Sequence, residues 1–278
     1  MKTARNEGGQ DGEEILKEVL KDRMQNKILC EALNVGSGIS LYHTGPCASE
    51  GPLPSLFYFA LSGPDTLCLD PFNQPVQFLQ GKKIRVFSLT LPGHEDGLPP
   101  TEAMGLWAKD LENGTNCVGN FVAQALTAIE FAIKAGLIDP DKLAIAGLSR
   151  GGFLAAHVAA HCEKIRHLAA FAPLTRLSKI KEFSALSDHP LVRSLDLENL
   201  APALSNRHIR LYIGNRDTRV GTTDCFDFAM SLVKDAHEKK IRSPQIELII
   251  TPSIGQMGHG TSPEIFAQGA EWILAKLD

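Results

Sequence analysis

The sequence predicts an α/β fold in which a mostly parallel central sheet is covered by helices on both faces. Apolar stretches of strand length alternate along the chain with longer stretches of helical period. One of them, residues 56–61, is a continuous apolar run that ends at Ser-Gly-Pro-Asp, as expected for a central buried strand. Such alternation indicates parallel pairing. We expect strands at 28–33, 38–43, 56–61, 84–89, 142–146, 167–172, 208–213 and 245–250.

The remaining segments predict a single domain over residues 13–278. Residues 1–12 are polar and Gly-rich, so we expect them to be disordered. Residues 13–26 have one apolar helical face that would dock on the core, and longer helical patterns follow at 120–134 and 153–161. Residues 174–205 interrupt the alternation with short helical fragments and a break at Pro190. We interpret this 174–205 segment as a small cap insertion.

Composition excludes several classes of partner. The chain has 278 residues, of which 44% are hydrophobic and 22% charged, and its net charge of −4 gives no electrostatic footprint for nucleic acid. No apolar run is long enough to cross a bilayer, and the first twenty residues lack a secretory apolar segment. We therefore expect a cytoplasmic protein with no nucleic-acid or membrane partner. The six cysteines form no C-x-x-C pair, so we expect no metal and no cofactor. The oligomeric state stays open, with a homodimer as one option.

A candidate nucleophile lies in the sequence Gly147-Leu148-Ser149-Arg150-Gly151, between a predicted strand and a predicted helix. This strand–turn–helix context is the one that the G-x-S-x-G motif requires. A tight turn exposes the serine hydroxyl above the sheet, and side chains at the two glycine positions would collide with the packed strand and helix. The turn also places Ser149 at a helix N-terminus, where free N–H groups favour developing negative charge.

A serine nucleophile needs a base, and the base needs an orienting acid. In folds with this turn, the acid follows the serine and the histidine comes last. Asp217 comes directly after the strand predicted at 208–213, and His259 follows the last predicted strand. Both would lie on loops at the carboxyl edge of the sheet, where ligands bind in such folds. The order and the edge together favour a Ser149–His259–Asp217 triad.

Other residues compete for these roles. Asp224 is a second candidate acid, although it lies farther from the strand end, and His94 precedes the serine and would line the mouth of the site. His157 and His161 have the i, i+4 spacing of a zinc pair, but the glutamate of H-E-x-x-H is missing. We interpret both as ordinary helix positions.

Two backbone donors would stabilise the oxyanion of an acyl transfer. The first is the N–H of Arg150, directly after the serine. The second is expected from the loop after residue 61, which reads Ser62-Gly63-Pro64-Asp65-Thr66. Pro64 has no N–H, and among Gly63, Asp65 and Thr66 we favour Asp65.

These motifs resemble the α/β-hydrolase superfamily. The segment Ile138-Asp139-Pro140-Asp141-Lys142 before the nucleophile strand is similar to prolyl-oligopeptidase-like and dienelactone-hydrolase-like members, and the resemblance covers roughly residues 50–278. Two departures stand out. Ser62-Gly63 occupies the place where many members have His-Gly, and the nucleophile is serine where dienelactone hydrolases have cysteine.

The resemblance and the triad order imply a serine hydrolase. The leading hypothesis is a carboxylic-ester hydrolase that acts on small or medium acyl substrates through an acyl-enzyme, because the 174–205 segment would overhang the serine and has only modest apolar character. The alternatives are an oligopeptidase-like or aminopeptidase-like activity, and a non-catalytic binding protein on the same fold.

Overall fold

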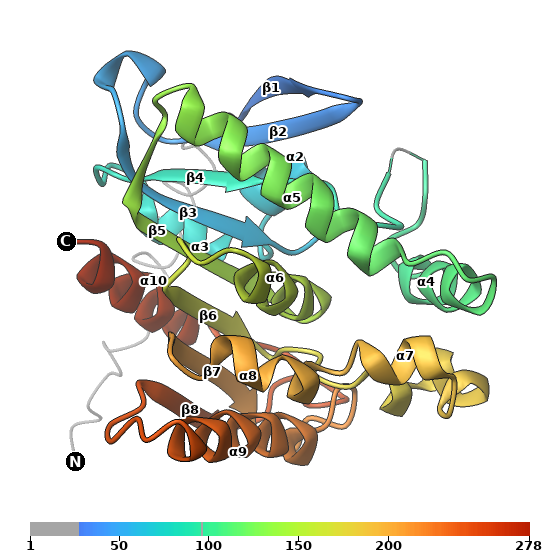
Figure 1. The fold of residues 1–278 in the computed structure, drawn as a ribbon. Helices are drawn as coiled ribbons and strands as arrows, with labels where there is room; N and C mark the ends of the chain where they lie inside the picture. The colour runs from blue at the N-terminus through green and yellow to red at the C-terminus, as the bar shows by residue number, and fades with distance from the viewer. Residues whose placement is uncertain (1–27, 96) are drawn as a thin grey trace, which may run out of the picture.

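An eight-stranded sheet forms the centre of the fold. The computed structural model describes residues 28–95 and 97–278, and its strands lie in the order β1-β2-β4-β3-β5-β6-β7-β8 (Figure 1). Only the pairs β1–β2 and β2–β4 are antiparallel. The predicted fold class is confirmed, whereas the expectations for residues 1–12 and 13–26 lie outside the described residues. The strands are β1 (Glu31–Gly36), β2 (Ile39–Thr44), β3 (Leu53–Phe59), β4 (Arg85–Ser88), β5 (Ile138–Leu148), β6 (His167–Phe171), β7 (His208–Gly214) and β8 (Ile246–Thr251).

Each face of the sheet carries its own core, because side chains alternate along a strand. In β3, Phe57 and Phe59 belong to one cluster of buried apolar residues, whereas Leu56 and Tyr58 belong to the other. The first cluster packs under α4 (Ala103–Glu112), α5 (Cys117–Lys134), α6 (Arg150–His161) and α9 (Thr222–Glu238). The second packs under α2 (Gly63–Cys68), α3 (Gln74–Leu79) and α10 (Pro263–Leu277), behind the sheet in Figure 1.

The element boundaries depart from the sequence prediction at turns. The strand expected at 28–33 begins three residues later, because Gly36, Ser37 and Gly38 all have positive φ and close the hairpin into β2. The sequence predicts no helix at α9, because its buried stripe is narrow: Cys225, Phe228, Ala229, Leu232 and Ala236. Among the helices of residues 28–95 and 97–278, none combines the length and apolarity needed to cross a bilayer.

The 174–205 segment packs down onto the helices beside it. It contains short 3-10 turns together with α7 (Pro190–Ser194) and α8 (Ala201–Leu204), and Pro190 begins α7 where a break was expected. Its apolar side chains are buried in the first core: Leu177, Ile180, Phe183, Val192 and Leu197. Arg176 ties the segment to α9 through an ion pair with Asp224 at 2.9 Å.

Candidate active site

The backbone of Ser149 is held in an unusual conformation between β5 and α6. Its φ of 55° and ψ of −117° lie outside the regions that non-glycine residues ordinarily occupy. Such a conformation persists only where the surroundings determine it. Here the Ser149 N–H donates to Phe171 O at 2.8 Å, and the Ser149 carbonyl accepts from the N–H groups of Phe153 and Leu174, each at 3.2 Å.

The glycines of this turn are required by close backbone contacts. A Cβ at Gly147 would lie 2.2 Å from the carbonyl of Gly151, and a Cβ at Gly151 would lie 1.9 Å from Phe59 O in the neighbouring strand. Both distances are far below van der Waals contact. The turn therefore packs directly against the carboxyl end of β3, as the spacing of the motif predicted.

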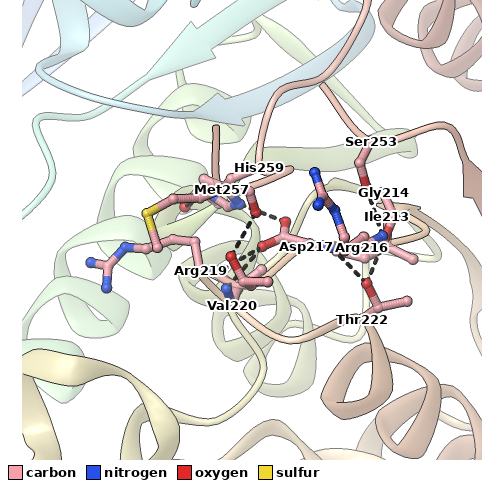
Figure 2. A network of polar contacts seen from close by, with 12 residues as sticks. Ile213, Gly214, Arg216, Asp217, Arg219, Val220, Thr222, Ser253, Met257 and His259 are labelled. Atoms are coloured by element: carbon pink, nitrogen blue, oxygen red, sulfur yellow. Dashed lines mark hydrogen bonds and ion pairs between the residues drawn. The ribbon is translucent and has the colours of Figure 1, made fainter. Parts of the chain in front are cut away.

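The structure brings the three predicted triad residues together. His259 Nε2 lies 2.8 Å from Ser149 Oγ, and His259 Nδ1 lies 2.7 Å from Asp217 Oδ2. The side chain of Asp217 is fully buried, and its Oδ1 accepts hydrogen bonds from the N–H groups of Arg219 at 2.9 Å and Val220 at 3.0 Å (Figure 2). One carboxylate oxygen is thus fixed by the backbone while the other faces the imidazole.

Two further residues hold the loops that carry Asp217 and His259, and sequence reasoning did not identify them. The Thr218 N–H and Oγ1 donate to Met257 O at 2.8 and 3.0 Å, which joins the two loops next to the imidazole. Ser253 Oγ accepts from the Arg216 N–H at 2.6 Å and donates to Asn215 Oδ1 at 2.9 Å (Figure 2). Ordinary threonine and serine residues in loops give no sequence signal for this role.

The competing residues have other partners. Asp224 pairs with Arg176, while Asp217 contacts the imidazole. His94 is buried at 4% exposure, and its Nε2 lies 3.1 Å from Arg150 Nη1. Burial, with a smaller contribution from the Arg150 charge, lowers the pKa of His94 to about 4, so the ring is neutral at pH 7.

The two histidines at zinc spacing make separate contacts. His157 Nε2 lies 2.9 Å from Leu195 O, and His161 Nδ1 lies 2.8 Å from His157 O, one turn back on α6. Within the described part of the chain, no cluster of His, Cys, Asp and Glu has the geometry to hold a metal ion.

The loop after β3 has most of its N–H groups already bonded. The N–H of Asp65, which the sequence favoured as second oxyanion donor, donates to Ser62 Oγ at 3.2 Å as the N-cap of α2. The N–H groups of Leu61 and Gly63 donate to Thr66 Oγ1 at 2.9 Å and Thr90 Oγ1 at 3.0 Å. Among the described residues, the N–H of Ser62 has no acceptor. The N–H of Arg150 lies in the first turn of α6, where N–H groups lack a partner within the helix.

A small, mostly apolar pocket of about 290 Å³ opens at Ser149. Its lining comes from the loops after β3 and β8, the segment between α2 and α3, the turn from β5 into α6, and α10: Ala60, Leu61, Pro71, Phe72, Leu148, Ser149, Arg150, His259, Gly260, Thr261 and Phe266. The 174–205 segment contributes no residue to this lining. The expectation that the segment overhangs the serine therefore does not fit, because its apolar side chains turn into the core.

Comparison with known proteins decides the family. The model of the prolyl oligopeptidase family matches residues 107–253, more than half of the chain. The chain belongs to the prolyl oligopeptidase family. The resemblance read from the sequence motifs is thereby confirmed, and this family member is a serine hydrolase by family and an α/β-hydrolase by fold.

Individual relatives are distant. Acylamino-acid-releasing enzyme 1 of Oryza sativa subsp. japonica is 30% identical over 97 residues, which span 34% of this chain and 11% of the rice enzyme. A Klebsiella pneumoniae protein assigned to the dienelactone hydrolases superimposes with a TM-score of 0.65 at 17% identity, over 91% of this chain and 99% of its own. The Pyrococcus horikoshii acylaminoacyl peptidase gives 0.68 at 13% identity, over 94% of this chain and 43% of its own. These two structures show the shared fold.

Proposed function

We propose that this prolyl oligopeptidase family member hydrolyses carboxylic esters of small or medium acyl groups, with Ser149 as nucleophile. The observation that carries the proposal is the line of hydrogen bonds from Ser149 Oγ through His259 to Asp217, at 2.8 and 2.7 Å. The imidazole takes the hydroxyl proton as the oxygen attacks the ester carbonyl carbon. The buried Asp217 carboxylate holds the ring and stabilises the imidazolium that forms.

Two backbone N–H groups would receive the charge on the tetrahedral intermediate. We assign them to Arg150, in the first turn of α6, and Ser62, whose N–H has no acceptor in the described part of the chain. Imidazolium then returns the proton to the departing alcohol, which leaves an acyl-enzyme. A water molecule, deprotonated by His259, hydrolyses the acyl-enzyme by the same route and restores the serine.

The pocket supports a small acyl group. Its volume is about 290 Å³, and its lining includes Phe72 and Phe266, which offer apolar contact. Tyr58 Oη donates to Phe72 O at 2.8 Å, so the wall that carries Phe72 is anchored to β3. A short acyl chain would fill this space without displacing the described side chains.

Peptide hydrolysis is the second candidate function. It is favoured by the family match over residues 107–253 and by the stretch that is 30% identical to the rice acylamino-acid-releasing enzyme. The same triad chemistry cleaves both bond types, since the acyl-enzyme is common to them and only the leaving group differs.

A non-catalytic binding protein is the third candidate. We also propose a cytoplasmic location, testable by cell fractionation.

One experiment separates the three candidates. The purified protein is treated with a fluorophosphonate probe and assayed against a series of p-nitrophenyl esters and a series of short peptide p-nitroanilides. We expect an adduct on Ser149 and higher kcat/KM for the esters, with Ser149→Ala slower by about 10⁴-fold or more. Faster peptide turnover would favour the peptidase, and an unlabelled Ser149 without turnover would favour the binding protein.

A further inference from the structure

The side chain of Arg150 has three unused hydrogen-bond donors beside the nucleophile. Its Nη1 lies 3.1 Å from His94 Nε2 and donates to Pro100 O at 3.1 Å, which accounts for both N–H bonds of that nitrogen. A guanidinium has five N–H bonds. The Nε and Nη2 bonds that remain have no acceptor in residues 28–95 and 97–278. They form one edge of the planar group, with the parallel geometry that matches the two oxygens of a carboxylate.

Within residues 28–95 and 97–278, the charge of Arg150 is also left without a paired anion. His94 is neutral at pH 7, as its lowered pKa shows, so it accepts a hydrogen bond from Arg150 without neutralising it. The nearby carboxylate of Glu182 is bound by both Nη atoms of Arg219, each at 2.8 Å. Burial and the Arg219 charge together lower the pKa of Arg150, which indicates a guanidinium with poor local compensation.

Arg150 stands at the wall of the pocket that contains Ser149. That pocket is otherwise mostly apolar, with His259 as the other ionisable side chain of its lining. A half-buried cation that is held by two neutral acceptors and belongs to the lining of a mostly apolar pocket is arranged to bind an anion from outside the chain.

We infer that Arg150 is a specificity-determining residue that binds a carboxylate carried by the substrate. The inference rests on the proposed function, since it places the carboxylate on a molecule whose ester bond Ser149 attacks. The preferred substrate is then an ester that bears one carboxylate within reach of the scissile carbonyl. The carboxylate can belong to the acyl part or to the leaving alcohol, and the two positions are separate arms of the test.

The test compares charged and neutral esters of matched shape. In the acyl arm, 4-nitrophenyl hydrogen adipate is compared with methyl 4-nitrophenyl adipate. In the leaving-group arm, 3-carboxy-4-nitrophenyl butyrate is compared with 3-methoxycarbonyl-4-nitrophenyl butyrate. The readout is kcat/KM for the charged ester divided by kcat/KM for its neutral counterpart. Because the same two esters are used with every enzyme variant, a difference in this ratio between variants does not reflect the intrinsic reactivity of the esters. We expect Arg150→Met to lower this ratio by roughly tenfold or more in one arm, and Arg150→Lys to lower it less.

Two variants guard against a purely structural effect. Glu182→Gln removes the carboxylate that faces both arginines and should raise the ratio, which no general loss of folding would do. Arg193→Met, at an exposed arginine of α7, should leave the ratio unchanged. An Arg150→Met enzyme with the wild-type ratio in both arms would overturn the inference, even with the ester hydrolysis intact.

A binding measurement makes the inference independent of turnover. Isothermal titration of hexanoate against hexanamide compares a carboxylate with a neutral group of the same shape. We expect the wild type to prefer hexanoate and Arg150→Met to lose the preference. Equal affinities in the wild type would overturn the inference. A protein that prefers hexanoate but shows no fluorophosphonate adduct and no ester turnover would instead refute the proposed function.

Discussion

Gly258 packs against the carbonyl of Arg216, so that a Cβ at position 258 would lie 2.0 Å from Arg216 O. This contact joins the loop that carries His259 to the loop that carries Asp217. Gly258 also has a φ of +71°, in the left-handed region that favours glycine. The imidazole and the carboxylate therefore meet because two loop backbones touch directly beside them.

Gly258→Ala is expected to move His259 away from Ser149. The added methyl group must push the two loops apart, and a displacement of about 1 Å at a catalytic group can cost on the order of 100-fold in rate. Steady-state kcat with a p-nitrophenyl ester measures the effect. Gly255→Ala is the matched control, because Gly255 lies in the same loop with a φ of +79° but has no atom within 4 Å of its Cβ position. Equal losses in both variants would assign the effect to backbone strain alone.

Asp217→Asn is expected to lower kcat by about 10⁴-fold while the protein stays folded. The amide keeps the shape of the buried carboxylate but cannot stabilise the imidazolium, and it favours the wrong imidazole tautomer. The control is Asp224→Asn, because Asp224 pairs with Arg176 and has no contact with His259. We expect this control to lose stability and to retain kcat. If Asp224→Asn lost the activity instead, the acid would be misassigned.

The nucleophile turn and the triad order could be predicted because their causes are local. Gly147 is required by a contact within the strand–turn–helix unit itself, and Gly151 by a contact with the adjacent strand β3, which the tight turn brings close in any fold of this kind. The ends of parallel strands place Asp217 and His259 on one edge of the sheet. The strands could be located for the same reason, since burial on both faces gives continuous apolar runs. Some of their ends differ from the prediction: the hairpin turn at Gly36 sets the end of β1, and β5 begins four residues earlier than expected, at Ile138.

The second oxyanion donor and the pocket wall could not be predicted, because they depend on contacts between distant residues. Which N–H group remains free after β3 is decided by the hydroxyls of Ser62, Thr66 and Thr90, and Thr90 belongs to another loop. In the 174–205 segment, Phe183 is apolar and could have faced either the pocket or the core. Only the packing against the helices decides that it is buried in the core.

Thr66→Val is expected to lower both stability and kcat. Thr66 is fully buried, and its Oγ1 accepts from the Leu61 N–H at 2.9 Å, next to the proposed donor Ser62. Valine keeps the shape and leaves a buried N–H without an acceptor, at a cost of about 1–3 kcal/mol. Urea denaturation and steady-state kinetics measure the two effects, with the exposed Thr127→Val on α5 as control. A stability loss with unchanged kcat would place the second donor elsewhere.

His157 is expected to make the protein less stable as the pH falls from 7 to 5. Burial at 3% exposure lowers its pKa from 6.5 to about 4, so the unfolded chain binds a proton that the folded chain does not. The stability that the neutral ring contributes is therefore fully present above pH 6.5 and is lost as the pH falls toward 4. The loss reaches about 2 kcal/mol at pH 5.

The comparison variant is His157→Gln, whose amide can still donate to Leu195 O but does not titrate. We expect its free energy of unfolding to be lower at pH 7 and to fall by less than that of the wild type between pH 7 and pH 5. Urea denaturation at the two pH values measures both, and His237→Gln at the exposed end of α9 should follow the wild type. An unchanged pH dependence in His157→Gln would mean that the buried ring takes up its proton in the folded protein as readily as in the unfolded chain.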